Sequence, residues 1–176
     1  MTDTLIRIPT LTTERLTLRA PQASDFDVYA EFCASDRSRG VGGPYNREQS
    51  FARLTAIIGH WHLRGFGRWL VADRETDEPL GTVGPMAPTD WPEPEIAWTL
   101  FASAEGRGIA YEAALAARDY VYDVLNWPTV ISCTVPDNHR SIALAKRMGA
   151  VQEPSFQHPT IGELLVWRHP APGTAT

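Results

Sequence analysis

Three strand-like segments follow one another in the middle of the chain, and no helix separates them. Residues 68–73 (RWLVAD) and 80–86 (LGTVGPM) flank the turn-like RETDEP and predict a hairpin, and 95–101 (EIAWTLF) predicts the next strand. A doubly wound sheet requires a regular alternation of strands and helices, which this order lacks. The sequence therefore predicts an α+β fold whose central sheet is mixed and largely antiparallel.

Further strands and helices are expected on both sides of this strand cluster. Before it, RLTLR (15–19) predicts a strand, and Ser24 with Asp25 can cap a helix that runs to about Ala34. The remaining expected elements are a helix over 47–63, a helix over 108–125, a strand over 130–135, a helix from 138 to 149 and a strand over 163–169. The predicted order is thus β-α-α-β-β-β-α-β-α-β, with helices that flank the sheet.

The length and charge of the chain limit its organisation and its partners. At 176 residues the chain suits one domain over 1–169, followed by a flexible tail over 170–176 (PAPGTAT). A net charge of −5 argues against a nucleic-acid partner, because neutralising phosphates requires a basic face. The same charge would suit a cationic acceptor.

The sequence shows no feature of export or of membrane insertion. The first residues, MTDTLIRIPTL, lack a basic region followed by an apolar run, and no apolar stretch approaches the roughly 20 residues that span a bilayer. We therefore expect a cytoplasmic protein without a membrane partner. Cys33 and Cys133 match no metal or redox spacing, so we expect two buried, reduced thiols and no metal ion.

The segment from Glu95 to Ala113 (EIAWTLFASAEGRGIAYEA) carries the first chemical signal. A strand leads into a short loop, and the loop leads into a helix through Gly106-Arg107-Gly108. Glycines allow close approach of the backbone to a ligand, and the free N–H groups of a helix start attract anions such as a pyrophosphate. A glycine pair at a helix start is equally often only a turn. The chain has no P-loop lysine, and Tyr111 stands where a dinucleotide fingerprint requires glycine.

The segment from Asn138 to Gly149 (NHRSIALAKRMG) carries the second signal. Asn138 can cap the helix, which places Ser141 at its third position. At the pitch of a helix, Ser141 lies on the same arc as the apolar residues Leu144, Ala145 and Met148. This arrangement places a hydroxyl group on the inward side of the helix. An amphipathic helix whose serine only satisfies the backbone would give the same pattern.

Together these two segments resemble the GNAT superfamily of N-acetyltransferases, and within it the branch that contains the RimJ and RimL ribosomal-protein N-terminal acetyltransferases. The resemblance covers nearly the whole chain. It begins with TTERLTLRAPQASDFD (12–27) and continues with EIAWTL (95–100), EGRGIAYEA (105–113) and NHRSIALAKRMGA (138–150). The last two motifs, in this order and at this spacing, are specific to the family.

The resemblance implies acetyl-CoA as co-substrate, without a metal. The pyrophosphate loop of the family, Arg/Gln-x-x-Gly-x-Gly/Ala, corresponds to residues 105–110. Glu105 departs from it, since a basic or amide residue is usual there, and we expect Arg107 to offset its charge. The implied cofactor-binding residues are Trp98, Leu100, Gly106, Arg107, Gly108, Ile109, Ala110, Tyr111, Asn138 and Lys146. Tyr111 is a second departure, because a small hydroxyl residue is usual there.

The resemblance also implies direct acyl transfer to an amine within a ternary complex. Backbone N–H groups of the strand around Trp98 to Leu100 would polarise the thioester carbonyl, and Ser141 would donate a proton to the leaving thiolate. Glu95 is the candidate base that deprotonates the amine, directly or through water; Glu93, His60 and His62 are alternatives. Glu95 would otherwise be a surface carboxylate of its strand or bind a cationic acceptor.

The identity of the acceptor stays open at this point. A protein N-terminus and a small-molecule amine both fit the motifs, since the two kinds of enzyme differ only in the acceptor groove. A catalytically silent acyl-CoA-binding module is the alternative function, favoured by the departures at Glu105 and Tyr111. Relatives commonly dimerise, so the resemblance also implies a homodimer.

Overall fold

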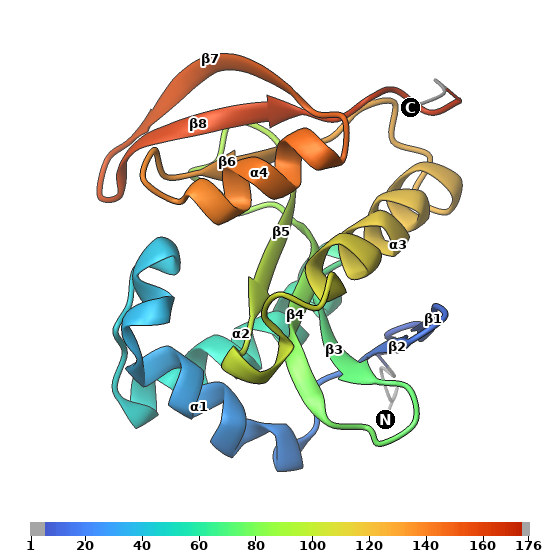
Figure 1. Ribbon diagram of the computed structural model, residues 1–176, viewed down its shortest axis with the longest axis vertical. Coiled ribbons are helices and arrows are strands. Elements are labelled where there is room, and N and C mark those ends of the chain that lie inside the picture. Colours follow the sequence, from blue (N-terminus) through green and yellow to red (C-terminus); the bar gives the residue numbers. More distant parts are fainter. Residues whose placement is uncertain (1–5, 174–176) are drawn as a thin grey trace, which may run out of the picture.

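The computed structural model describes residues 6–173 of the chain (Figure 1). Of the expected tail, residues 170–173 follow the last strand, and 174–176 lie outside the described residues. The strands are β1 (Leu11–Thr12), β2 (Leu16–Arg19), β3 (Trp69–Asp73), β4 (Pro79–Met86), β5 (Glu95–Leu100), β6 (Ile131–Thr134), β7 (Val151–His158) and β8 (Gly162–Arg168). The helices are α1 (Phe26–Ala34), α2 (Arg47–Arg64), α3 (Ile109–Asp123) and α4 (His139–Arg147), with short 3-10 turns η1 (Ala23–Asp25), η2 (Asp36–Val41) and η3 (Ala102–Ala104).

The strands form one sheet in the order β1-β2-β3-β4-β5-β6-β8-β7. Every neighbouring pair is antiparallel except β5 and β6, which run parallel. The expected mixed, largely antiparallel α+β fold is therefore confirmed. The predicted hairpin is β3–β4, and its turn is held by the Asp73 carboxylate, which accepts the backbone N–H groups of Glu75 and Thr76 at 3.0 and 3.1 Å.

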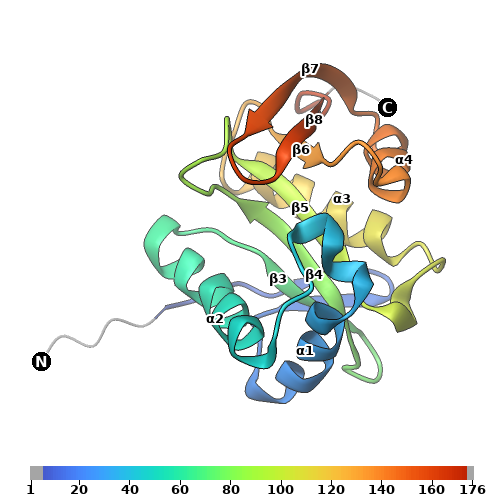
Figure 2. The same cartoon turned by 90° about the vertical axis from the view of Figure 1, so that its left-hand side faces the viewer.

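Helices cover both faces of the sheet, as Figures 1 and 2 show from two sides. Helix α3 packs on one face and buries Ile109, Ala113, Ala117 and Val121 almost completely. Its alanines allow the helix axis to approach the strands closely. Helices α1 and α2 cover the other face, where Phe32, Leu54, Leu70 and Phe101 belong to a second apolar cluster. The middle strands are thus buried on both sides.

Two strands were not expected from the sequence. Strand β1 is only two residues long, and β7 contains Pro154 among mostly polar residues. Strand β7 lies at the edge of the sheet, and its register shifts between Glu153 and Phe156, around the proline. A proline has no N–H to donate, so an edge strand with a bulge is where a sheet tolerates it. A prediction that relies on alternating apolar residues therefore does not detect β7.

Candidate active site

Strands β5 and β6 open a gap in the middle of the sheet. Their register contains one pair, Glu95 with Ile131, and a Ser132 Oγ–H bond to the Ile96 carbonyl (2.6 Å) holds them together just beyond it. The Phe101 N–H bonds to the Leu80 carbonyl of the β4 side at 2.9 Å. Because backbone groups alternate in direction along a strand, those of residues 98 and 100 point away from β4 and into the gap.

A cavity of about 560 Å³ lies along β5 beyond its pairing with β6, a volume in the range of small-molecule sites. Its walls come from four segments: the end of α1 with η2, residues 98–100 of β5, the loop 104–111 with the start of α3, and α4 with its cap. The cavity therefore joins the α3 side of the sheet to the α1 side. Of the sequence-predicted residues, Trp98, Leu100, Gly106, Gly108, Ile109, Ala110, Tyr111, Asn138 and Ser141 line it.

The loop before α3 has the backbone that anion binding requires. Gly106 and Gly108 have φ of +73° and +76°, values that glycine adopts without the strain of a side chain. Gly108 is the N-cap of α3 and supplies no capping side chain, and the first N–H groups of a helix lack intrahelical partners. A Cβ at Gly106 would meet no heavy atom within 4 Å. The loop thus offers backbone donors, with space beside them, at the positive end of a helix dipole.

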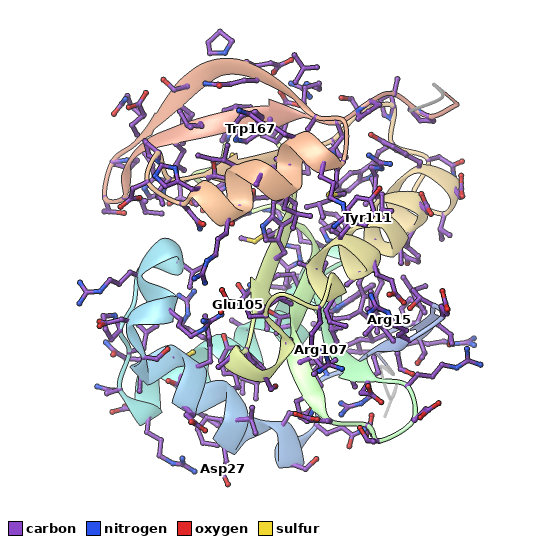
Figure 3. The ribbon with its side chains drawn as sticks, viewed as in Figure 1. Arg15, Asp27, Glu105, Arg107, Tyr111 and Trp167 are labelled. Atoms are coloured by element: carbon purple, nitrogen blue, oxygen red, sulfur yellow. The ribbon has the colours of Figure 1, made fainter. Side chains whose placement is uncertain are left out.

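The carboxylate of Glu105 is neutralised from two neighbouring elements. It forms ion pairs with Arg37 of η2 and with Arg140 of α4, and these arginines, Arg37 foremost, lower the pKa of its carboxyl group. Arg107 lies on the other side of the loop (Figure 3), where its guanidinium donates to the Ser103 carbonyl. The charge that departs from the family pattern is therefore offset by Arg37 and Arg140, and not by Arg107 as expected.

The start of α4 carries the expected cap and places Ser141 in the cavity. The Asn138 Oδ1 accepts the backbone N–H of Ser141 at 3.1 Å, which confirms the predicted capping. The Ser141 Oγ in turn accepts the indole N–H of Trp98 on β5 at 3.1 Å. Because the hydroxyl oxygen is the acceptor in that bond, its own proton stays available for a ligand.

Two cofactor-binding candidates, Arg107 and Lys146, do not line the cavity, and Tyr111 lines it in contact with an arginine. Tyr111 lines the cavity, and the Arg147 guanidinium stacks over its ring at 4.0 Å. Arg107 lines a second hollow of about 600 Å³ beside β1 and α3. Lys146 is not among the lining residues of either; its ammonium lies 5.6 Å from the ring of Trp167. Lys146 is therefore not brought together with the others.

Glu95 is buried, so the interpretation of this residue as a surface carboxylate of its strand is wrong. The residue is 4% exposed, and its carboxylate accepts the Cys133 N–H at 2.7 Å, where β5 and β6 pair. Burial raises the pKa of Glu95 to about 7, although the Cys133 N–H and Arg68 oppose this shift. The side chain points to the α1–α2 face, opposite to its neighbour Ile96, which α3 covers.

Two of the three alternative bases, Glu93 and His60, are held by other partners. Glu93 forms a two-point ion pair with Arg168, with both distances 2.7 Å, and Arg168 lowers the pKa of Glu93. His60 contacts the Phe66 carbonyl through Nδ1 at 2.7 Å and accepts the Ala87 N–H through Nε2 at 3.0 Å. His62 is exposed on α2. Of the two carboxylates, Glu95 is the one whose pKa is raised toward neutrality.

The cysteines are free, as expected, but only Cys33 is fully buried; Cys133 is half-buried. Within residues 6–173, no cluster of three or more His, Cys, Asp or Glu side chains could hold a metal ion. In the same range, no helix combines the length and the apolar character that crossing a membrane demands.

Three arginines of this region were not predicted as site residues. Arg37 and Arg140 reach Glu105 from distant parts of the chain, and the charge of Arg68, directly before β3, acts on Glu95 of β5. No local motif marks them, because each contact depends on the tertiary fold.

Comparison with known proteins gives a consistent result for this arrangement. The acetyltransferase (GNAT) domain family model matches residues 15–151. The chain is 29% identical over 148 residues to an uncharacterized N-acetyltransferase, p20, of Bacillus licheniformis, covering 82% of this chain and 83% of that protein. Among solved structures, an acetyltransferase from Agrobacterium tumefaciens C58 is 39% identical with a TM-score of 0.86, covering 97% of this chain and 99% of that one.

A structure of RimL, a ribosomal L7/L12 α-N-protein acetyltransferase in complex with coenzyme A, has a TM-score of 0.72 at 18% identity, covering 92% of this chain and 97% of that one. At this identity the likeness shows the fold alone.

Proposed function

Because the chain belongs to the GNAT acetyltransferase family, we propose that it transfers the acetyl group of acetyl-CoA to a primary amine by direct transfer in a ternary complex. The observation that carries this proposal is the gap between β5 and β6, whose cavity is bounded at one end by the glycine loop and reaches the other face of the sheet. A thioester can enter from the loop side and an amine from the α1 side.

The residues present fit acetyl-CoA. The backbone N–H groups of residues 106–110 would hold the pyrophosphate, and Asn138 would contact the pantetheine arm. Arg37 and Arg140 add positive charge at the same rim, since together they exceed the single charge of Glu105. Bound acetyl-CoA supplies the activated acetyl thioester. The structure of RimL with coenzyme A supports a site of this kind in the same fold.

The side chains around the gap provide the proton transfers that the reaction needs. The amine forms the new C–N bond and loses a proton, while the C–S bond breaks and the thiolate gains one. Glu95 takes the first proton through water, since its carboxyl group is buried outside the cavity lining. Its pKa of about 7 is near that of an α-amine, about 7.7–8.0. Ser141 donates the second proton from its free hydroxyl.

The backbone of β5 assists the acyl carbon. The N–H groups of Trp98 and Leu100 point into the gap and would polarise the thioester carbonyl, where negative charge develops. These donors are fixed by the ladder with β4, so they need no reorganisation during the reaction.

The alternative, a catalytically silent acyl-CoA-binding module, rested on Glu105 and Tyr111. Pairing of Glu105 with two arginines removes the repulsion that would have weakened a phosphate site. Membership of the RimJ/RimL branch, a cytoplasmic location and a homodimer stay predictions, as does the absence of a nucleic-acid partner.

The test of this proposal is release of free thiol from acetyl-CoA with a panel of amines, with the acetylated product identified by mass spectrometry. We expect amine-dependent thiol release that Ser141→Ala slows, and that Lys146→Ala, a change outside the cavity, leaves unaltered. Absence of amine-dependent release across small amines and peptides with free N-termini would contradict the proposed enzyme activity.

A further inference from the structure

The sheet face toward α1 and α2 carries a positively charged group that the reaction described above does not use. Arg68 directly precedes β3 and lies opposite Gly84 of β4, where a Cβ would come within 2.8 Å of the Arg68 Cα. Gly84 is paired with Ala97, and Ala97 shares its face of β5 with Glu95. The guanidinium of Arg68 is thus carried on the same face as the Glu95 carboxylate, on the side where the amine would enter.

This guanidinium lacks a counter-charge in direct contact. Among the residues that the structure describes, it forms no hydrogen bond and no ion pair, although it is half-buried. Burial lowers the pKa of Arg68, and the Glu95 carboxylate opposes this from beyond ion-pair distance. A half-buried charge without a partner is costly, so a ligand that supplies the partner would be bound strongly.

A second cation and polar groups surround it. Arg53 of α2 lowers the pKa of Arg68 by repulsion, and its own contacts are the Val41 carbonyl (3.3 Å) and the ring of Tyr45 (4.2 Å). Tyr29 of α1 lies close enough to raise the pKa of Arg68. The hydroxyl of Thr82, on the same face of β4, is buried and has no hydrogen-bond partner within the described part of the chain.

The chemistry of this cluster selects an anion. A guanidinium presents a planar fork of donors that matches the oxygens of a carboxylate or phosphate group. Glu95 repels such a group but attracts an ammonium. A molecule with both groups therefore satisfies both side chains. The net charge of −5 favours a cationic acceptor, whereas the guanidinium of Arg68, on the face of the sheet that carries Glu95, favours an acceptor with an anionic group.

Resting on the acetyl transfer proposed above, we propose that Arg68 is the anchor for an anionic group of the acceptor, and that the acceptor is a small primary amine bearing a carboxylate or phosphate. The anion pairs with the Arg68 guanidinium, supported by Arg53, while the amine lies toward Glu95 and the β5–β6 gap. Acceptor choice then depends on a side chain that neither gives nor takes a proton in the reaction, although its charge lowers the pKa of Glu95.

The experiment compares matched acceptors that differ only in the anion. The probes are common L-amino acids beside their carboxamides, phosphoethanolamine beside ethanolamine, and a short peptide with a free N-terminus. Calorimetric titration on the CoA-loaded protein measures binding without turnover, and thiol release measures KM and kcat. The variants are Arg68→Gln and Arg68→Lys, with Arg64→Gln as the control, because Arg64 is an exposed arginine at the end of α2.

We expect wild type to bind at least one anionic amine about tenfold or more tightly than its neutral counterpart, the range expected for a charge-assisted hydrogen bond. Arg68→Gln should abolish this preference without changing CoA affinity or the KM of the neutral amine, and Arg68→Lys should retain part of it. Arg64→Gln should behave as wild type. The carboxylate and phosphate pairs show which anion is preferred.

Three results would overturn the anion site. The first is equal affinity for both members of every pair, and the second is an unchanged preference in Arg68→Gln. The third is a peptide that binds better than every anionic small amine. If the preference is present but no amine releases thiol, the anion site stands and the proposed enzyme activity fails.

Discussion

Replacing Glu95 by glutamine should stabilise the fold at alkaline pH and remove the pH dependence of the reaction. In the wild type, burial raises the pKa of Glu95 from 4.5 to about 7. Between these two values the folded protein holds a proton that the unfolded chain releases. Stability therefore falls as the pH rises through this window. At about 1.4 kcal/mol for each tenfold change in proton affinity, the loss is about 3 kcal/mol once the pH exceeds 7.

Glu95→Gln is neutral at every pH and keeps an acceptor for the Cys133 N–H. We expect it to be more stable than wild type by about 3 kcal/mol at pH 8, and by less than about 1 kcal/mol at pH 5. For a chain of this length the alkaline difference corresponds to about 6–12 °C in Tm. Urea and thermal unfolding at both pH values measure it.

The matched control is Glu93→Gln. Arg168 lowers the pKa of Glu93, so this carboxylate contributes stability that is present at neutral pH and lost in acid. Glu93→Gln should therefore destabilise the fold at pH 8, the opposite sign. A Glu95→Gln variant whose stability relative to wild type is the same at pH 5 and pH 8 would refute the raised pKa. A wild-type pH–rate profile in the same variant would place the base elsewhere.

Three further substitutions test the cavity. Ser141→Ala should lower kcat on the order of 10²-fold with acetyl-CoA affinity little changed, as measured by thiol release and calorimetry; unchanged turnover removes Ser141 from the proton transfer. Glu105→Gln removes the carboxylate that pairs with Arg37 and Arg140, so both arginines become free to contact the phosphates. Acetyl-CoA should then bind more tightly, on the order of fivefold at low salt, and the gain should shrink as salt is added. Weaker binding contradicts this prediction. Asn138→Ala should lower the unfolding free energy by about 1 kcal/mol through loss of the cap and weaken acetyl-CoA binding; an unchanged urea midpoint would oppose the capping role.

Much of the fold and of the loop site could be predicted because the signals are local. The β3–β4 hairpin follows from two apolar runs and a turn, and the cap of α4 follows from an asparagine three positions before Ser141. The loop before α3 could be predicted from Gly106 and Gly108, whose positive φ glycine adopts more readily than other residues.

The rest depends on contacts between distant parts of the chain. Glu105 and Arg37 are separated by 68 positions, so no sequence pattern reveals that an acidic departure from the family is neutralised. Glu95 was recognised as acidic, but its burial, and with it the raised pKa, follows from packing against β6 and the neighbouring loop. Strand β7 was not predicted because a proline argues against a strand in the sequence, whereas the structure places Pro154 at a bulge.

The most direct test of the central claim is calorimetric titration with acetyl-CoA, beside NAD and ATP, of wild type, Gly108→Glu and Gly59→Glu. A glutamate at position 108 would place a negative side chain against the pyrophosphate. The nearest heavy atom to a new Cβ there is 3.6 Å away, so the Cβ makes no clash, while the positive φ of Gly108 adds backbone strain. At Gly59 on α2 a Cβ meets nothing within 4 Å, which makes the same substitution a control for the added charge and side chain. We predict selective binding of acetyl-CoA to wild type and to Gly59→Glu, and its loss in Gly108→Glu. Equal binding in all three proteins, or none in wild type, would contradict an acetyl-CoA site at the loop before α3.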